Sequence, residues 1–124
     1  MRGGEKHLLA IVELGGYPNF VPLYEKSGYQ VTIVNSQRKA RNFLKKQQPD
    51  VVVCEYNFQS DFRDRTSNIE TLLAVLQKYP QVRLIVFYMS EHEFKLNQVR
   101  ERFNIDTVMP FPIDETRLEE VLSD

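Results

Sequence analysis

The sequence predicts an open, doubly wound α/β sheet of five parallel strands, in the order 2-1-3-4-5, with five helices. Three observations predict it. Short and nearly continuous apolar runs recur along the 124 residues, as is typical of strands buried on both faces. Segments with helical periodicity separate these runs, and parallel strands need helical crossovers. The length fits one domain, so we treat residues 1–124 as a single unit.

The apolar runs give the strands. The first, Leu-Leu-Ala-Ile-Val at 8–12, is broken by Gly-Gly-Tyr-Pro at 15–18, a turn-forming combination. The third, Val-Val-Val-Cys at 51–54, follows the Pro-Asp pair at 49–50. Together the predicted strands are 8–12, 29–34, 51–54, 84–88 and 105–109.

Polar residues with capping chemistry precede the helical segments. Serine, asparagine and aspartate accept hydrogen bonds from the free N–H groups of a first helical turn. A serine three residues before a glutamate forms a reciprocal capping box. The expected caps are Asn19, Ser36, Ser67 with Glu70, Ser90 with Glu93, and Asp114. The first helix is expected to tolerate Pro22 in its first turn and to end at Ser27-Gly28, and the second is expected to reach about Gln48.

Composition excludes several classes of protein. Net charge is −1, so no strong field attracts nucleic acid or an anionic membrane. No apolar stretch reaches the roughly 18 residues of a membrane span, and the N-terminus lacks a signal-peptide pattern. The lone cysteine, Cys54, cannot form an internal disulfide, which favours a reducing, cytoplasmic setting. No arrangement typical of a catalytic triad, a phosphate-binding loop or a metal site is visible, so we expect no enzymatic activity and no cofactor.

Functional groups in such a sheet gather at the carboxyl ends of the strands. The candidate residues at these positions are Glu13, Asn35, Glu55, Tyr88 and Met109.

Three of these strand ends lie in motifs that resemble the receiver domain of response regulators. Residues 49–55, Pro-Asp-Val-Val-Val-Cys-Glu, resemble the strand that leads to the phospho-acceptor aspartate. Residues 109–111, Met-Pro-Phe, resemble the Lys-Pro-Phe signature after the fifth strand, and residues 9–13 resemble the strand before an acidic pair. The resemblance extends from about Leu8 to Leu122 and implies a flavodoxin-like, receiver-like fold.

Receiver domains accept a phosphoryl group from a histidine kinase on an aspartate. A Mg²⁺ ion, a lysine and a hydroxyl side chain assist the transfer. The resemblance implies which residues stand at these positions here. Glu55 replaces the acceptor, Glu13 and Leu14 replace the acidic pair, Tyr88 replaces the hydroxyl residue, and Met109 replaces the lysine.

Two further positions depart from the family pattern. Asp106 stands where an aromatic switch residue usually precedes the lysine. The loop after Glu55 lacks the usual proline, is about three residues longer, and carries Asp61, Arg63, Asp64 and Arg65.

These replacements predict a pseudo-receiver, in which the fold persists and phosphotransfer is lost. Glutamate moves the carboxylate by one methylene, and a misplacement of about 1 Å can cost roughly 10²-fold in rate. Met109 supplies no charge, and one lost charge-stabilising group costs on the order of 10²–10³-fold. The expected function is regulation through protein–protein contact in a two-component signalling or transcription-regulatory protein, with control by a partner or by a ligand at the former phosphorylation site.

Two alternatives stay open. One is an unconventional phospho-acceptor that uses Glu55 and a divalent cation held with Glu13, and the other is a flavodoxin-like binder of a small molecule. A binder is expected to show a pocket lined by Tyr88, Met109 and the loop of Tyr56. Glu55 either mimics the phosphorylated aspartate or is a replacement without functional effect at a site that is no longer used.

The resemblance also implies a contact surface, formed by the fourth helix, the fifth strand and the fifth helix. A homodimer or a protein partner is expected there, and Lys95, Arg102, Arg117 and Glu120 are the candidate interface residues, together with Phe94 and Gln98. The basic second helix is expected to be a solvated face, without direct nucleic-acid binding.

Overall fold

A computed structural model describes residues 6–13, 16–56 and 69–123 of the chain. These residues form a five-stranded, fully parallel sheet in the order β2-β1-β3-β4-β5. The strands are β1 (Lys6–Ile11), β2 (Tyr29–Val34), β3 (Val51–Glu55), β4 (Arg83–Tyr88) and β5 (Thr107–Pro110). The predicted doubly wound α/β fold and its strand order are therefore confirmed.

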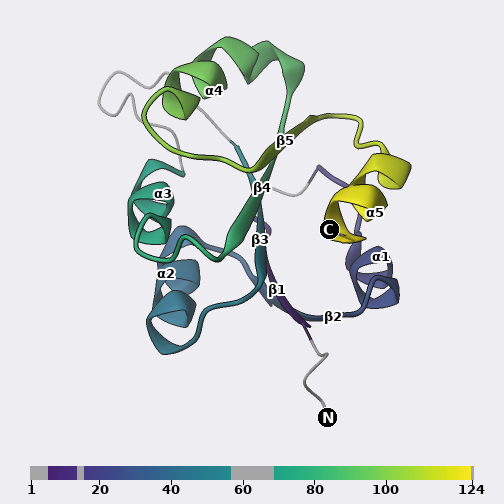
Figure 1. Ribbon diagram of the computed structural model, residues 1–124. Helices are drawn as coiled ribbons and strands as arrows, with labels where there is room; N and C mark the ends of the chain where they lie inside the picture. The colour runs from purple at the N-terminus through teal and green to yellow at the C-terminus, as the bar shows by residue number, and fades with distance from the viewer. Residues whose placement is uncertain (1–5, 14–15, 57–68, 124) are drawn as a thin grey trace.

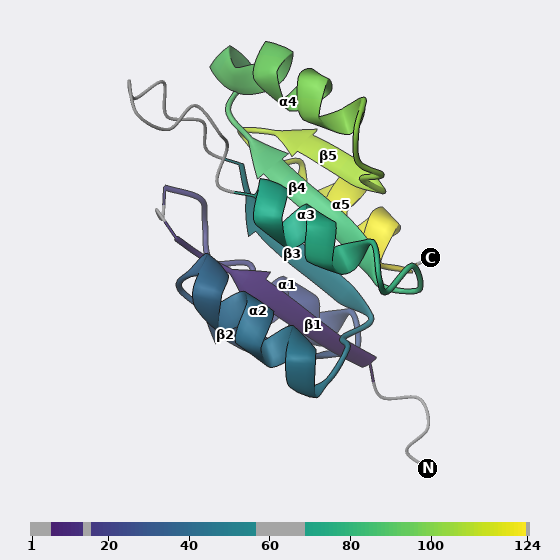
Figure 2. The same ribbon diagram turned by 90° about the vertical axis from the view of Figure 1, so that its left-hand side faces the viewer.

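The helices lie on both faces of the sheet. They are α1 (Val21–Lys26), α2 (Gln37–Lys46), α3 (Glu70–Leu76), α4 (Glu93–Arg100) and α5 (Glu115–Ser123), with a 3₁₀ turn η1 (Ser90–His92) before α4. Figure 1 shows α1 and α5 on one face and α2 and α3 on the other, and Figure 2 shows α2 and α3 in front of the strands. No helix among the described residues combines the length and the apolar composition needed to cross a membrane.

Each face of the sheet has its own apolar core, because successive side chains of a strand point to opposite faces. Leu9, Val52 and Val86 pack with α2, α3 and α4 in one cluster. Leu8, Val53 and Ile85 pack with α1 and α5 in the other. β3 is buried along its whole length, as the uninterrupted apolar run predicted.

The local signals at three helix ends act as expected. Ser36 Oγ accepts the backbone N–H of Lys39 at the start of α2. Asp114 Oδ1 accepts the N–H groups of Thr116 and Arg117 at the start of α5. The chain leaves α1 through Gly28 with φ of 98°, a left-handed conformation that favours glycine.

Other boundaries differ from the prediction. Asn19 accepts the N–H of Val21, but the N-cap position of α1 is Phe20. The expected capping box of Ser90 with Glu93 does not form: Ser90 begins the 3₁₀ turn, and His92 precedes α4 without a side-chain cap. α2 ends at Lys46 rather than near Gln48. The expected cap Ser67 lies outside the described residues.

The fifth strand begins two residues later than predicted. The Asp106 carboxylate accepts the backbone N–H of Leu84 at 2.8 Å, so a side chain occupies the first pairing position beside β4. Backbone pairing of the two strands then starts with Thr107 opposite Ile85.

The carboxyl-terminal end of α5 is tied to the sheet. The Tyr29 hydroxyl donates to the carbonyl of Leu122 at 2.8 Å, and Arg83 Nη1 donates to the carbonyl of Val121 at 2.8 Å. Arg83 Nη2 also donates to the Tyr29 hydroxyl. These bonds satisfy helix-end carbonyls that have no partner within the helix.

Candidate functional site

Glu55 is the side chain around which the candidate site is built. It ends β3 and is only 4% exposed, and it is the one buried charged residue within the described part of the chain. In the parallel register Glu55 lies opposite Phe87, which lies opposite Met109. Residues in register on neighbouring strands share a face of the sheet. Glu55 therefore points to the α1/α5 side.

A pocket of about 290 Å³ opens beside Glu55. Its walls come from the ends of β1 and β3, from Phe87 of β4, and from the segment that leads into α1. Aromatic rings dominate the wall opposite the sheet. They belong to Tyr17, Phe20 and Tyr24.

The aromatic rings contact one another in a continuous row. The centroid distances are 5.5 Å between Tyr17 and Phe87, 5.7 Å between Phe20 and Phe87, and 6.4 Å between Phe20 and Tyr24. At the outer end, Tyr17 meets Phe111 edge-to-face at 5.6 Å. Such tilted and edge-to-face contacts are the favourable arrangements of aromatic pairs.

The electrostatics of this pocket follow from burial and from the Glu55 charge. Burial, with the nearby Glu55 carboxylate, raises the pKa of Tyr17 to about 12 and that of Tyr24 well above its ordinary value. Complete burial likewise raises the pKa of the Cys54 thiol, and Glu13 and Glu55 add to the effect. Both hydroxyls and the thiol therefore stay protonated at neutral pH.

Glu13 also lies near this end of the sheet, but its carboxylate is engaged by a neighbouring helix. Gln37 Nε2, in the first turn of α2, donates to Glu13 Oε1 at 2.9 Å. Its predicted partner in the acidic pair, Leu14, lies outside the described residues. Among the residues that the structure describes, no three histidine, cysteine, aspartate or glutamate side chains gather closely enough to hold a metal ion.

Tyr88 is not brought to Glu55. It is one residue beyond Phe87 and therefore faces the opposite side of the sheet, where it joins the α2/α3/α4 core. Burial raises the pKa of its hydroxyl, and Glu93 of α4 adds to the effect while Arg100 opposes it.

Met109 shares the face of Glu55 but is enclosed in the core. It is 1% exposed and belongs to the cluster that contains Leu118 and Leu122 of α5. The residue of this segment that reaches the aromatic row is Phe111, two positions further along. Asp106 lies at the other end of the strands, bonded to Leu84.

The pocket predicted for a small-molecule binder is therefore present in a different place. We expected Tyr88, Met109 and the Tyr56 loop to line it, and instead Tyr17, Phe20 and Tyr24 do so with Glu55 and Phe87. Sequence reasoning missed the three aromatic residues, although Tyr17 and Phe20 stand directly after a predicted strand end, where ligand-contacting loops are common. The charged loop residues Asp61, Arg63, Asp64 and Arg65 lie outside the described residues.

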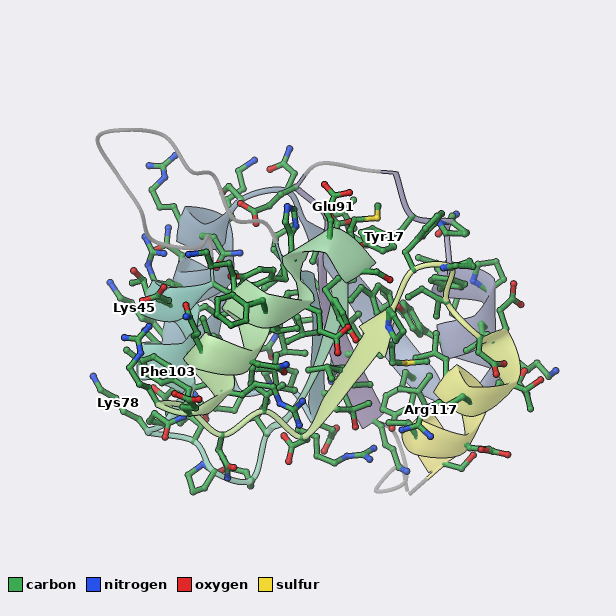
Figure 3. All side chains as sticks on the ribbon, turned by 90° about the horizontal axis from the view of Figure 1, so that it is seen from above. Tyr17, Lys45, Lys78, Glu91, Phe103 and Arg117 are labelled. Carbon is green, nitrogen blue, oxygen red and sulfur yellow. The ribbon has the colours of Figure 1, made fainter. Side chains whose placement is uncertain are left out.

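The predicted interface residues lie on α4, α5 and the turn after α4. Arg102 Nη2 donates to Glu70 Oε1 at 3.0 Å and so links this turn to α3. Arg117 and Glu120 are exposed on α5, and Lys95 is half-buried on α4. Figure 3 shows Arg117 on one flank of the molecule and the basic residues Lys45 and Lys78 on the other.

With this geometry established, comparison with known proteins identifies the fold. No protein-family model matches the sequence, and no curated protein matches it. Solved structures do match. A response regulator receiver domain protein from Clostridium thermocellum has a TM-score of 0.72 at 15% identity, covering 95% of this chain and 90% of its own.

Two further structures extend the same result. The chemotaxis response regulator CheY4 of Vibrio cholerae has a TM-score of 0.71 at 17% identity, covering 95% of this chain and 96% of its own. NtrX from Brucella abortus has a TM-score of 0.74 at 13% identity, but this chain spans only 26% of it. The chain has the fold of response-regulator receiver domains, and in NtrX a unit of this fold is part of a larger protein.

Proposed function

We propose that this chain is a pseudo-receiver domain, which regulates a two-component-type signalling or transcription-regulatory protein through protein contact and without phosphorylation. One observation carries the proposal. The carboxylate at the end of β3, Glu55, is buried against the aromatic rings of Tyr17 and Phe87. Met109, which stands where the resemblance to receiver domains implies a lysine, is buried in the core.

This environment opposes phosphoryl transfer. A phosphoryl group adds a charge of about −1.5 to −2 and three acceptor oxygens. Among the described residues that line the pocket, none is a lysine or an arginine, and most of the wall is apolar. Burying such a charge among apolar groups costs several kcal/mol or more unless donors compensate it. The hydroxyl of Tyr88 faces the other side of the sheet and offers no donor there.

Intact-mass spectrometry after incubation with acetyl phosphate and Mg²⁺ tests the proposal. We expect the mass to stay unchanged under conditions that label a conventional receiver domain in a parallel reaction. A phosphoryl adduct that disappears in Glu55→Gln but persists in Glu120→Gln, an exposed glutamate on α5, would instead establish Glu55 as an unconventional acceptor.

The proposed contact surface is formed by α4, β5 and α5. Phe94 on α4 is 70% exposed, the most exposed large apolar side chain that the structure describes. Arg102, in the turn after α4, and Arg117 and Glu120, on α5, are the exposed charged residues of the proposed surface. We propose a homodimer or a partner protein at this surface, with a cytoplasmic location and no direct membrane or nucleic-acid contact.

Equilibrium sedimentation at tens of micromolar, about the range of weak dimers, tests the surface. The expected result is a dimer that Phe94→Ser dissociates. Ile33 is the matched control because it is also exposed, at 54%, but lies on β2 at the opposite edge of the sheet. A wild-type protein that is monomeric at every concentration, or equal effects of Phe94→Ser and Ile33→Ser, would refute the homodimer.

A further inference from the structure

A basic hollow lies between α2 and the end of α3, on the face of the sheet opposite to α1 and α5. Its volume is about 270 Å³, close to the lower limit of the roughly 300–1,000 Å³ typical of ligand pockets. Figure 3 shows Lys45 and Lys78, one from each wall, on the same flank of the molecule. The residues that give the hollow its chemistry are Arg38, Arg41 and Lys45 of α2, with Val75, Lys78 and Tyr79 from α3 and the turn after it.

The sequence of α2 concentrates positive charge at this hollow. Arg38, Arg41 and Lys45 follow one another at intervals of three and four residues, which places them on one face of the helix. Five of the ten residues of α2 are basic and none is acidic. The one acidic residue of α3, Glu70, is engaged by Arg102. The flank is therefore positive, although the net charge of the whole chain is −1.

The four cationic side chains of the hollow have no anionic partner within the described part of the chain. None of Arg38, Arg41, Lys45 and Lys78 forms an ion pair or a side-chain hydrogen bond with another described residue. Like charges around one hollow repel each other, and an anion bound between them replaces this repulsion with attraction. The cations are therefore available to a ligand.

The mixture of arginine and lysine suits phosphate groups. A guanidinium group donates two parallel hydrogen bonds to phosphate oxygens, and an ammonium group adds a compact positive charge. A concave surface with charge of one sign also raises the local concentration of oppositely charged ligands. Duplex DNA and anionic membranes need an extended basic surface, whereas a hollow of this volume accommodates one compact ligand. The shape and the four charges together favour a small anion that carries several negative charges.

We propose that the basic hollow binds a small molecule with two or more linked phosphate groups, as in a nucleoside diphosphate or triphosphate. The four cations contact the phosphate chain. Val75 and Tyr79 are half-buried and pack against the α2/α3/α4 core, so they form a fixed, less polar part of the wall for the organic part of the ligand. Binding here is independent of the proposed function, since no residue of this hollow lines the pocket beside Glu55.

The test is an NMR titration of the ¹⁵N-labelled full chain with tripolyphosphate and, separately, with ATP, without divalent cations and at a constant ionic strength of about 0.15 M. This ionic strength screens diffuse attraction beyond about 8 Å, and ligand concentrations up to about 5 mM cover Kd values near 1 mM. We expect both compounds to cause saturable shifts centred on α2 and residues 75–79, with ATP binding at least as tightly as tripolyphosphate. Citrate, which carries three carboxylates and no phosphate, is expected to bind at least about tenfold more weakly.

Two neighbouring lysines provide a matched pair of variants. Lys45 and Lys46 are both exposed in the last turn of α2, but only Lys45 lines the hollow. Lys45→Gln is expected to weaken tripolyphosphate binding about three- to tenfold, and Lys46→Gln less than about twofold, because salt screens the more distant charge. Lys78→Gln, on the other wall, is expected to match Lys45→Gln. All three lysines are exposed, so the substitutions are expected to leave the fold intact.

Four outcomes of these titrations would overturn the proposal: no saturable shift with either phosphate compound, equal affinity for citrate, equal losses in Lys45→Gln and Lys46→Gln, or shifts centred away from α2 and α3. A parallel titration with duplex DNA of about 12 base pairs distinguishes a nucleic-acid surface from a small-molecule site. DNA binding more than about tenfold tighter than that of tripolyphosphate, in the same salt, would also overturn the proposal.

Discussion

The substitution Met109→Lys distinguishes two placements of residue 109, at the strand-end site or in the apolar core. Alignment of Met-Pro-Phe with Lys-Pro-Phe suggests that a lysine at 109 would restore a cation to the site. The structure instead places Met109 in the core, 1% exposed, with Leu118 and Leu122. Phe111 is 39% exposed and touches Tyr17, so a lysine amine at this position would reach solvent beside the aromatic row.

The magnitude follows from the cost of burying an amine. A lysine enclosed among apolar side chains is held neutral, because desolvation penalises the charged form. Holding lysine neutral near pH 7, well below its ordinary pKa, costs about 1.4 kcal/mol for each pH unit of the difference, or roughly 4–5 kcal/mol. Total stabilities are about 5–15 kcal/mol, so Met109→Lys is expected to remove much of the stability.

The pH dependence has a definite sign. The unfolded state binds the lysine proton and the native state does not, so stability rises with pH. The loss caused by Met109→Lys is expected to shrink to roughly 2 kcal/mol near pH 9. Phe111→Lys is expected to lose only about 1 kcal/mol, the value of one aromatic contact, with no such pH dependence.

Urea unfolding monitored by circular dichroism, near pH 7 and near pH 9, measures these differences. Met109→Leu is the control for lost packing, and it is expected to cost less than about 1.5 kcal/mol. A Met109→Lys protein as stable as Met109→Leu at both pH values, or a Phe111→Lys protein that is the less stable of the two lysine variants, would refute the placement of Met109 in the core.

Three other predictions concern groups whose surroundings the structure defines. Tyr17 is expected to ionise near pH 12 rather than near its ordinary pKa of 10. Its protonated hydroxyl favours the folded state, so this contribution to stability is present below pH 10 and is lost as the pH rises toward 12. Alkaline absorbance titration of wild type against Tyr17→Phe measures the ionisation, and a transition near pH 10 would contradict the prediction. Cys54 is expected to resist thiol reagents in the native protein and to react on unfolding, because burial raises its pKa; rapid native labelling would show that β3 is accessible. Asp114→Ala is expected to destabilise the protein by about 1 kcal/mol in thermal or urea unfolding, because it removes the cap of α5; an effect below about 0.3 kcal/mol would show that the cap adds nothing.

The fold was predictable because its signals are local. The buried run of Val51–Glu55 and the caps Ser36 and Asp114 each specify their own element, without reference to distant residues. Ser90 shows the limit of such signals. The same serine-to-glutamate spacing fits a helix that starts at once and one that is preceded by a 3₁₀ turn, and packing decides between them.

The site was less predictable because it depends on register and on loop placement. Side-chain direction reverses at every residue of a strand, so an uncertainty of one residue moves Tyr88 from the pocket to the α4 side. Glu55 was identified correctly as a strand-end residue from its own strand alone. The aromatic wall was not, since nothing local in Gly-Gly-Tyr-Pro-Asn-Phe specifies that Tyr17 and Phe20 turn back over the sheet to Phe87.

Titration of the ¹⁵N-labelled protein with beryllofluoride and Mg²⁺ is the most direct measurement of whether the strand-end site still accepts a phosphoryl-like group. Beryllofluoride occupies the place of a phosphoryl group on a competent acceptor carboxylate. The aromatic, enclosed environment of Glu55 predicts no saturable shift at Glu55, Phe87 or Tyr17. Saturable shifts at these residues that require Mg²⁺ and vanish in Glu55→Gln would contradict the pseudo-receiver.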